Sequence, residues 1–190
     1  MSSSDLIRWG GFAAMIGGVV WVLAGLLFRA LGPESAVTDV LFIIAALCTV
    51  GGFVGFHALQ KDNYGRIGRG GFWTVVVATL ALVVGLLDEL LGSTIPRGIW
   101  TVTGLLFALG TLAVFVGFVL YGAASLQARV LPRWCGIVFI VGPSIFLLGA
   151  LLGNSWEPFG GILFGLLWLA LGYILLLQRE TSLGQPSRVI

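Results

Sequence analysis

Charged side chains are scarce in this sequence of 190 residues. Lysine and arginine contribute 10 and aspartate and glutamate 8, so charged residues make up 9% of the chain, whereas 58% of the residues are hydrophobic. A water-soluble domain carries roughly a quarter charged residues, because charge keeps its surface hydrated. A disordered chain needs low hydrophobicity and high net charge. The scarcity of charge therefore excludes both classes and leaves a polytopic membrane protein.

Histidine and cysteine are also scarce. His57 is the single histidine, which excludes paired-histidine haem ligation and two-histidine zinc motifs. The two cysteines, Cys48 and Cys135, fall in different hydrophobic segments at different depths, which argues against a disulfide. Basic residues form no run longer than two, which argues against nucleic-acid binding. We expect no metal and no nucleic-acid partner, and a non-catalytic protein more than an enzyme; no cofactor is indicated.

The few charges divide the chain into long uncharged segments. A hydrocarbon core about 30 Å thick requires about 20 apolar residues per helix. Six segments meet this length. Their apolar residues occupy successive positions along the chain, whereas the strands of a membrane barrel alternate apolar and polar residues. The sequence therefore predicts an all-α integral membrane protein, with residues 1–190 forming a single transmembrane domain. The six predicted spans cover about 9–29, 39–60, 70–90, 101–125, 133–153 and 157–178.

The charges are distributed unequally between the two sides of the predicted membrane. Eight of the ten basic residues lie at the N-terminus, in the second and fourth connections or in the C-terminal tail. The first, third and fifth connections hold only Arg29 and Arg97, together with most of the acidic residues. Because loops rich in lysine and arginine stay in the cytoplasm, we expect a multi-pass protein of the cell membrane with both termini cytoplasmic.

Short motifs recur about every 60 residues and suggest an internal repeat. Residues 8–12 (RWGGF), 69–72 (RGGF) and 133–137 (RWCGI) begin the first, third and fifth spans. Residues 53–56 (FVGF) and 115–118 (FVGF) recur in the second and fourth spans. Three parallel helical hairpins related by an axis along the membrane normal would explain this, and chance matches in a chain with 29 glycines are the alternative. The hairpins would cover 9–60, 70–127 and 134–178.

Glycine spacing and one internal proline predict features of helix packing. Gly51 and Gly55 form one of several small-xxx-small pairs, which let membrane helices approach closely, either within one bundle or between two copies. Pro143 is the only proline well inside a span, and Ser144 follows it. We expect Pro143 to kink or break the fifth helix, either for packing or as a functional hinge like those of transporters.

The acidic residues on the predicted outer side are a candidate ion or ligand site. Asp88 and Glu89 end the third span, where the helix dipole disfavours a carboxylate, so we expect a pair with Arg29 or Arg97. A cation-attracting vestibule is the alternative. The charged members of the candidate site are Asp39, Asp88, Glu89, Glu157, Arg29 and Arg97.

Two tryptophans complete the candidate site. Trp21 and Trp168 are predicted near the middle of the membrane, whereas the other five fall mostly near its two interfaces. An indole N–H at mid-membrane requires an acceptor, or else the ring lines a pocket for a hydrophobic ligand.

Two functions fit these observations. The first is a non-catalytic module that binds membrane lipid or a small hydrophobic ligand within its helix bundle, or that packs as a homo-oligomer or as a subunit of a larger membrane assembly. The alternative is a small transporter or channel with an acidic outer vestibule and a fifth helix broken at Pro143. A continuous polar path through Thr79, Thr103, Thr111 and Ser144 would favour the alternative.

Overall fold

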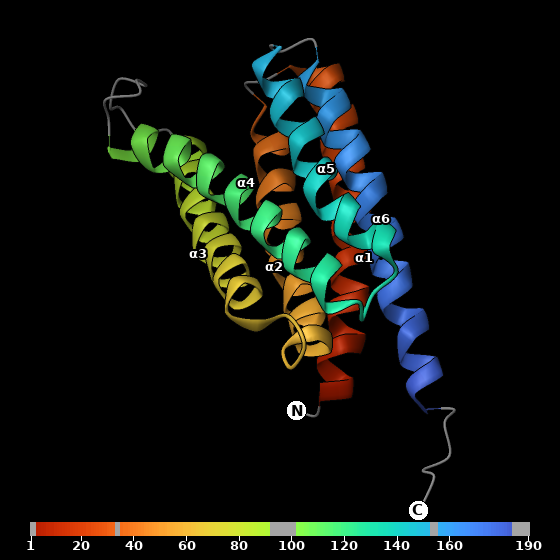
Figure 1. The fold of residues 1–190 in the computed structure, drawn as a ribbon. Helices are drawn as coiled ribbons and strands as arrows, with labels where there is room; N and C mark the ends of the chain where they lie inside the picture. The colour runs from red at the N-terminus through yellow and green to blue at the C-terminus, as the bar shows by residue number, and fades with distance from the viewer. Residues whose placement is uncertain (1–2, 33–34, 92–101, 153–155, 184–190) are drawn as a thin grey trace, which may run out of the picture.

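The computed structural model describes residues 3–32, 35–91, 102–152 and 156–183, and this part of the chain is helical with no strand (Figure 1). The all-α prediction is confirmed. Each helix joins its neighbour through a short connection, as an up-and-down bundle requires. The helices are α1 (Ser3–Leu31), α2 (Ala36–Gln60), α3 (Gly65–Leu90), α4 (Val102–Ala128), α5 (Arg133–Leu151) and α6 (Glu157–Leu183).

Five of the six helices are long and apolar enough to cross a membrane. The apolar part of α5 within the described residues, Arg133–Gly149, is shorter than that standard. Large apolar side chains cover the outside of the bundle, including Val77 on α3 and Leu109 on α4, each 62% exposed. A surface of this kind is stable against lipid and not against water. The chain is therefore a polytopic membrane protein.

The helices form a ring in the order of the sequence. Each helix packs against the next, and α6 packs against α1, which closes the ring. Figure 1 shows the α3–α4 hairpin diverging from the other four helices toward the end of the bundle away from the N-terminus. We call the end that holds Ser3 and Leu183 the terminal end, and the other end the opposite end. Because the chain crosses the bundle six times, both ends of the described chain lie at the terminal end.

Glycines bring the backbones of α1, α2 and α6 into contact. A Cβ atom on Gly10 of α1 would lie only 2.4 Å from the Cα of Gly55 on α2. A Cβ atom on Gly18 would lie 2.7 Å from the carbonyl oxygen of Gly165 on α6. A side chain at either position would therefore force the helices apart. The prediction of close helix packing at the small-residue positions is confirmed for these interfaces.

The repeated glycines are equivalent in the first two hairpins only. Gly10 packs against Gly55 within the first hairpin, and Gly71 packs against Gly117 within the second. In the third hairpin, Gly136 instead packs against Gly122 of α4. The motifs thus mark the same kind of contact twice, and the superposition of all three hairpins stays a prediction.

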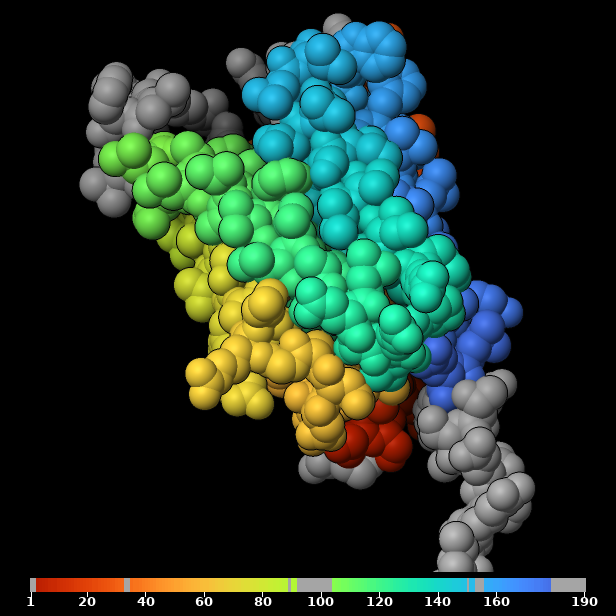
Figure 2. All heavy atoms as spheres, viewed as in Figure 1, coloured from red at the N-terminus to blue at the C-terminus, as the bar shows by residue number. Residues whose placement is uncertain are grey.

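Aromatic side chains fill the centre of the ring in its middle and terminal parts. Phe53 is fully buried, and its ring centroid lies 4.7 Å from that of Phe118, 5.0 Å from Tyr121, 5.6 Å from Phe139 and 5.4 Å from Trp168. These five rings come from α2, α4, α5 and α6, so they join helices that face one another across the ring. Figure 2 shows the lower part of one face closed, with α4 against α5.

Candidate ligand-binding cavity

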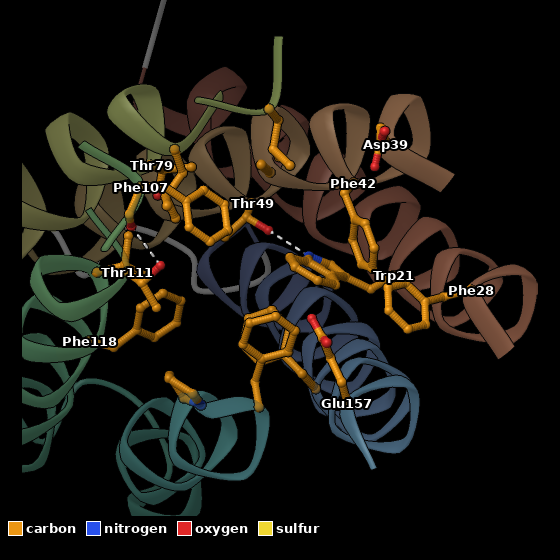
Figure 3. Close-up of a pocket in the computed structure, with 17 residues that line it drawn as sticks. Trp21, Phe28, Asp39, Phe42, Thr49, Thr79, Phe107, Thr111, Phe118 and Glu157 are labelled. Atoms are coloured by element: carbon orange, nitrogen blue, oxygen red, sulfur yellow. Dashed lines mark hydrogen bonds between the residues drawn. The ribbon is translucent and has the colours of Figure 1, made fainter. Parts of the chain in front are cut away.

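A cavity of about 310 Å³ lies inside the ring in the half nearer the opposite end (Figure 3). All six helices contribute to its wall. Phe28 comes from the last part of α1, Phe107 from the first part of α4, and Glu157 is the first residue of α6, which places the cavity toward the end away from the termini.

Each helix presents one stripe of side chains to this cavity. On α2 the stripe is Asp39, Phe42, Ala46 and Thr49, and the other helices show the same spacing of three, four or seven residues. That spacing returns to the same helix face after one or two turns. The wall is therefore built from one continuous face of each helix.

Trp21 is the central ring of the cavity wall. Its centroid lies 5.4 Å from that of Phe42, 5.3 Å from Phe146 and 5.2 Å from Phe164, so α1 is joined through it to α2, α5 and α6. Its indole Nε1–H donates to the hydroxyl oxygen of Thr49 at 3.1 Å (Figure 3). Thr49 in turn donates to the carbonyl of Ala45 at 2.9 Å. Trp21 therefore has the acceptor that the sequence led us to expect, and it also lines the cavity; a hydrophobic ligand at this position stays a prediction.

Replacement of Thr49 with valine tests the hydrogen bond to Trp21. Valine keeps the shape of threonine but leaves the indole N–H without an acceptor, so we expect a loss of about 1–2 kcal/mol of stability. The control is Thr74→Val, since Thr74 makes the same kind of intrahelical bond, to the carbonyl of Gly70 at 2.9 Å, with no second residue dependent on it. Thermal unfolding in detergent measures both variants. Equal melting temperatures would show that the Trp21 bond contributes nothing.

The cavity wall is mostly apolar and carries few polar groups. The hydroxyls belong to Thr49, Thr79 and Thr111, and the Thr111 hydroxyl donates to the carbonyl of Phe107 at 2.8 Å. The carboxylates belong to Asp39 and Glu157, both half-buried and both in the first turn of their helices. A mainly apolar wall with a few placed polar groups is typical of small-molecule sites.

Aromatic rings close the cavity toward the terminal end. Phe118 and Phe164 line the cavity, and their ring centroids lie 6.0 Å and 5.9 Å from that of Trp168, which is 1% exposed. Beyond Trp168 lie Phe53 and Phe139. We call these five rings the aromatic floor. The floor separates the cavity from the terminal end.

A second polar group lies beyond the floor. The Gln60 amide donates to the Tyr121 hydroxyl at 3.3 Å, and the Tyr64 hydroxyl is hydrogen-bonded to Nδ1 of His57. Burial raises the pKa of Tyr64 to about 12, against the opposing effect of the nearby Arg69 charge, so its hydroxyl stays protonated at neutral pH. The ring of His57 also stacks on Phe72, with ring centroids 4.1 Å apart. These groups do not connect to the cavity hydroxyls, because the aromatic floor lies between them.

The structure brings four of the predicted site residues together. Asp39, Glu157, Trp21 and Pro143 all line the cavity. Trp168 lies one layer deeper, and its indole N–H has no hydrogen-bond partner among the described residues.

The prediction that α5 is broken at Pro143 is wrong for this structure. The α5 helix continues from Arg133 to Leu151 without interruption through Pro143. The Ser144 hydroxyl donates to the carbonyl of Ile140 at 2.7 Å, one turn back, so it is engaged within its own helix and does not line the cavity. A proline removes one backbone donor, and the remaining helical hydrogen bonds keep the helix continuous.

The predicted pairing of the outer charges stays a prediction. Arg97 lies outside the described residues, as does the side chain of Glu89. Asp88 is half-buried near the end of α3, and Arg29 is exposed near the end of α1. Neither Asp88 nor Arg29 lines the cavity. Of the outer charges that the structure describes, the cavity therefore includes Asp39 and Glu157 but not Asp88 or Arg29.

Most of the cavity wall was missed by sequence reasoning. The phenylalanines of the wall and Thr49 were not among the predicted site residues, although Thr79 and Thr111 were named as parts of a polar path. The available signal was the spacing of aromatic and threonine residues at one helical face, such as Phe107, Thr111 and Phe118. In helices that are apolar on every side, this spacing does not reveal which face points inward.

Comparison with known protein families, with curated proteins and with solved structures found no match. A function can therefore be argued only from the site itself, from the shape of the cavity and the chemistry of its wall. For this chain those features are an apolar cavity within a membrane bundle, an aromatic floor on one side, and two carboxylates on the other.

Proposed function

We propose that this protein is a non-catalytic integral membrane module that binds a small, mostly apolar molecule in the cavity between its helices. The observation that carries the proposal is the cavity of about 310 Å³ lined by aromatic rings. Ligand sites in proteins typically start at about 300 Å³ and have apolar walls with a few polar groups. In the middle and terminal parts of the ring, glycine contacts and buried aromatic rings hold the described helices together.

The surrounding bilayer is a direct source of such a molecule. Phe107 lines the cavity and is 45% exposed, so its ring borders both the cavity and the outside of the bundle. The neighbouring Leu105, Leu106 and Leu109 are exposed as well and face the region that lipid occupies. Membrane lipids are therefore among the proposed partners.

Filling the cavity tests the proposal. Thr111→Phe places a phenyl ring in the cavity, and we expect it to weaken binding of a neutral fluorescent apolar probe, N-phenyl-1-naphthylamine, by about ten-fold or more, the equivalent of 1.4 kcal/mol or more. The matched control is Leu112→Phe, the next residue on α4, which is 57% exposed and does not line the cavity. Binding is measured by fluorescence titration of the protein in lipid nanodiscs.

The two variants together make the result decisive. Loss of saturable binding in Thr111→Phe with wild-type binding in Leu112→Phe supports the cavity as the site. Saturable binding of equal strength in both variants would show that the probe binds elsewhere. Absence of saturable binding in the wild-type protein would overturn the proposal. Native mass spectrometry of the purified protein then identifies any lipid retained by the wild type and lost from Thr111→Phe.

Transport is the second candidate function, and one observation favours it over a channel. The cavity reaches the middle of the bundle and stops at the aromatic floor, as in one of the two states of an alternating-access transporter. A channel needs a continuous path, and Trp168 with the rings around it occupies the centre of the ring. Transport would require these rings to move apart.

Two further expectations remain proposals. The distribution of basic residues supports a cytoplasmic location of both termini in the cell membrane. The described ends of α1 and α6 lie on one side of the bundle, as this orientation requires. The exposed apolar surface leaves room for a homo-oligomer or for a place in a larger membrane assembly.

A further inference from the structure

The part of the cavity wall that α1, α2 and α6 form, which we call the mouth, combines carboxylates with aromatic rings. It consists of Trp21, Phe28, Phe42, Asp39 and Glu157. Phe28 and Phe42 lie with ring centroids 6.2 Å apart, and Trp21 contacts Phe42 at 5.4 Å. Figure 3 shows Asp39 above Phe42, and Glu157 directed into the cavity on the side of Trp21. Three rings and two acidic groups from three helices thus surround one end of the cavity.

The charge of the wall has one sign only. Among the described residues that line the cavity, two are acidic and none is basic. Within the described part of the chain, Glu157 has no ion-pair or hydrogen-bond partner for its carboxylate. Glu157 is the first residue of α6, where the positive end of the helix dipole attracts a carboxylate. The helix dipole alone does not explain why this carboxylate lies beside aromatic rings inside a cavity. A cation bound in the cavity would compensate the negative charge of Glu157.

We propose that the ligand is an organic cation, with an ammonium head in the mouth and an apolar body deeper in the cavity. This inference rests on the proposed function and specifies its ligand class. The negative faces of aromatic rings attract a cation, most strongly for tryptophan. A substituted ammonium loses less hydration energy on leaving water than a compact primary ammonium does, and a carboxylate in the site offsets part of that loss. The part of the wall that includes Thr79, Thr111 and Phe118 accommodates the apolar body.

The same arrangement excludes anionic ligands. An anion in the mouth would meet the carboxylate of Glu157 in an environment of low polarity, where repulsion between like charges is strong. Neutral apolar molecules would enter the cavity but gain nothing from the mouth. The proposal therefore predicts discrimination by charge between molecules of the same shape.

A pair of isosteric probes measures this discrimination. Benzyltrimethylammonium and neopentylbenzene have the same shape, and only the first carries a charge. Both are titrated as competitors of N-phenyl-1-naphthylamine with the purified full-length protein in dodecyl maltoside, a detergent without charge or ammonium groups. The variants are Glu157→Gln, which removes the Glu157 charge from the mouth and leaves Asp39 in place, and Asp62→Asn, which removes an exposed charge between α2 and α3, outside the cavity.

We expect Glu157→Gln to weaken the apparent affinity for benzyltrimethylammonium about ten-fold, because the carboxylate contact is lost. The apparent affinity for neopentylbenzene should change less than about two-fold. Asp62→Asn should leave both unchanged. Equal displacement by the two probes, or no effect of Glu157→Gln on the charged one, would overturn the organic-cation proposal and leave the cavity as a neutral ligand site. Absence of saturable binding of the fluorescent probe itself would instead overturn the proposed function.

Discussion

Gly10→Ala is expected to lower the melting temperature of the protein in detergent by roughly 5–10 °C, the effect of an overpacking cost of about 1–3 kcal/mol. The reason is the contact between α1 and α2, where a Cβ on Gly10 would lie 2.4 Å from the Cα and 2.7 Å from the backbone nitrogen of Gly55. Backbone atoms cannot rotate away as a flexible side chain can. The two helices must therefore separate, and the contacts along both are weakened.

The matched control is Gly70→Ala, a glycine near the start of α3 that makes no close contact with another helix. A Cβ atom on Gly70 meets nothing within 4 Å, and alanine is the better helix former. We therefore expect an unchanged or slightly raised melting temperature, from a gain of at most about 1 kcal/mol in stability. Equal destabilisation by both substitutions would show that the glycines act through local helix properties and not through the contact of α1 with α2.

Phe53→Ala is expected to destabilise the protein by about 3–5 kcal/mol, the usual cost of removing a fully buried phenyl ring. Phe53 contacts the rings of Phe118, Tyr121, Phe139 and Trp168, so its loss leaves a void between four helices. Chemical or thermal unfolding in detergent measures the change.

The control for this substitution is Phe159→Ala. Phe159 is 50% exposed on α6, and we expect a loss of less than about 1 kcal/mol, because its ring is covered only on one side. If Phe53→Ala does not fold, Phe53→Leu supplies the measurement, with an expected loss of about 1–2 kcal/mol. A stability of Phe53→Leu equal to that of the wild type would contradict the importance of the aromatic floor.

The spans were predictable because a charge within hydrocarbon is costly, so the positions of charges limit the helices. The structure contains all six predicted helices, and several extend beyond the predicted spans, as α1 does from Ser3. A charged residue near the end of a span does not end the helix, because its side chain can extend to the polar interface of the membrane. Five helices meet the length for crossing a membrane, and only α5 falls short.

The cavity was less predictable than the spans. Trp21 was identified because a mid-membrane indole needs an acceptor, and Asp39 and Glu157 because they are charged. Their common site depends on the rotation of α1, α2 and α6 about their own axes, and the glycine contacts fix that rotation. Asp88 was predicted as a site residue for the same reason as Asp39 and Glu157. It lies outside the cavity wall, because α3 presents Thr79, Leu82 and Leu86 to the cavity instead.

The contact between α1 and α6 has a consequence for how the protein is made. Helices enter the membrane in order during synthesis, so α1 is inserted long before α6 leaves the ribosome. Until then the α1 face that carries Gly18 and Gly25 has no partner in its own chain, although both glycines are in close contact with α6 in the finished protein. The cavity wall includes Glu157 and Phe164, so it too is incomplete until the last helix arrives. The newly made protein therefore completes this cavity only after α6 has entered the membrane.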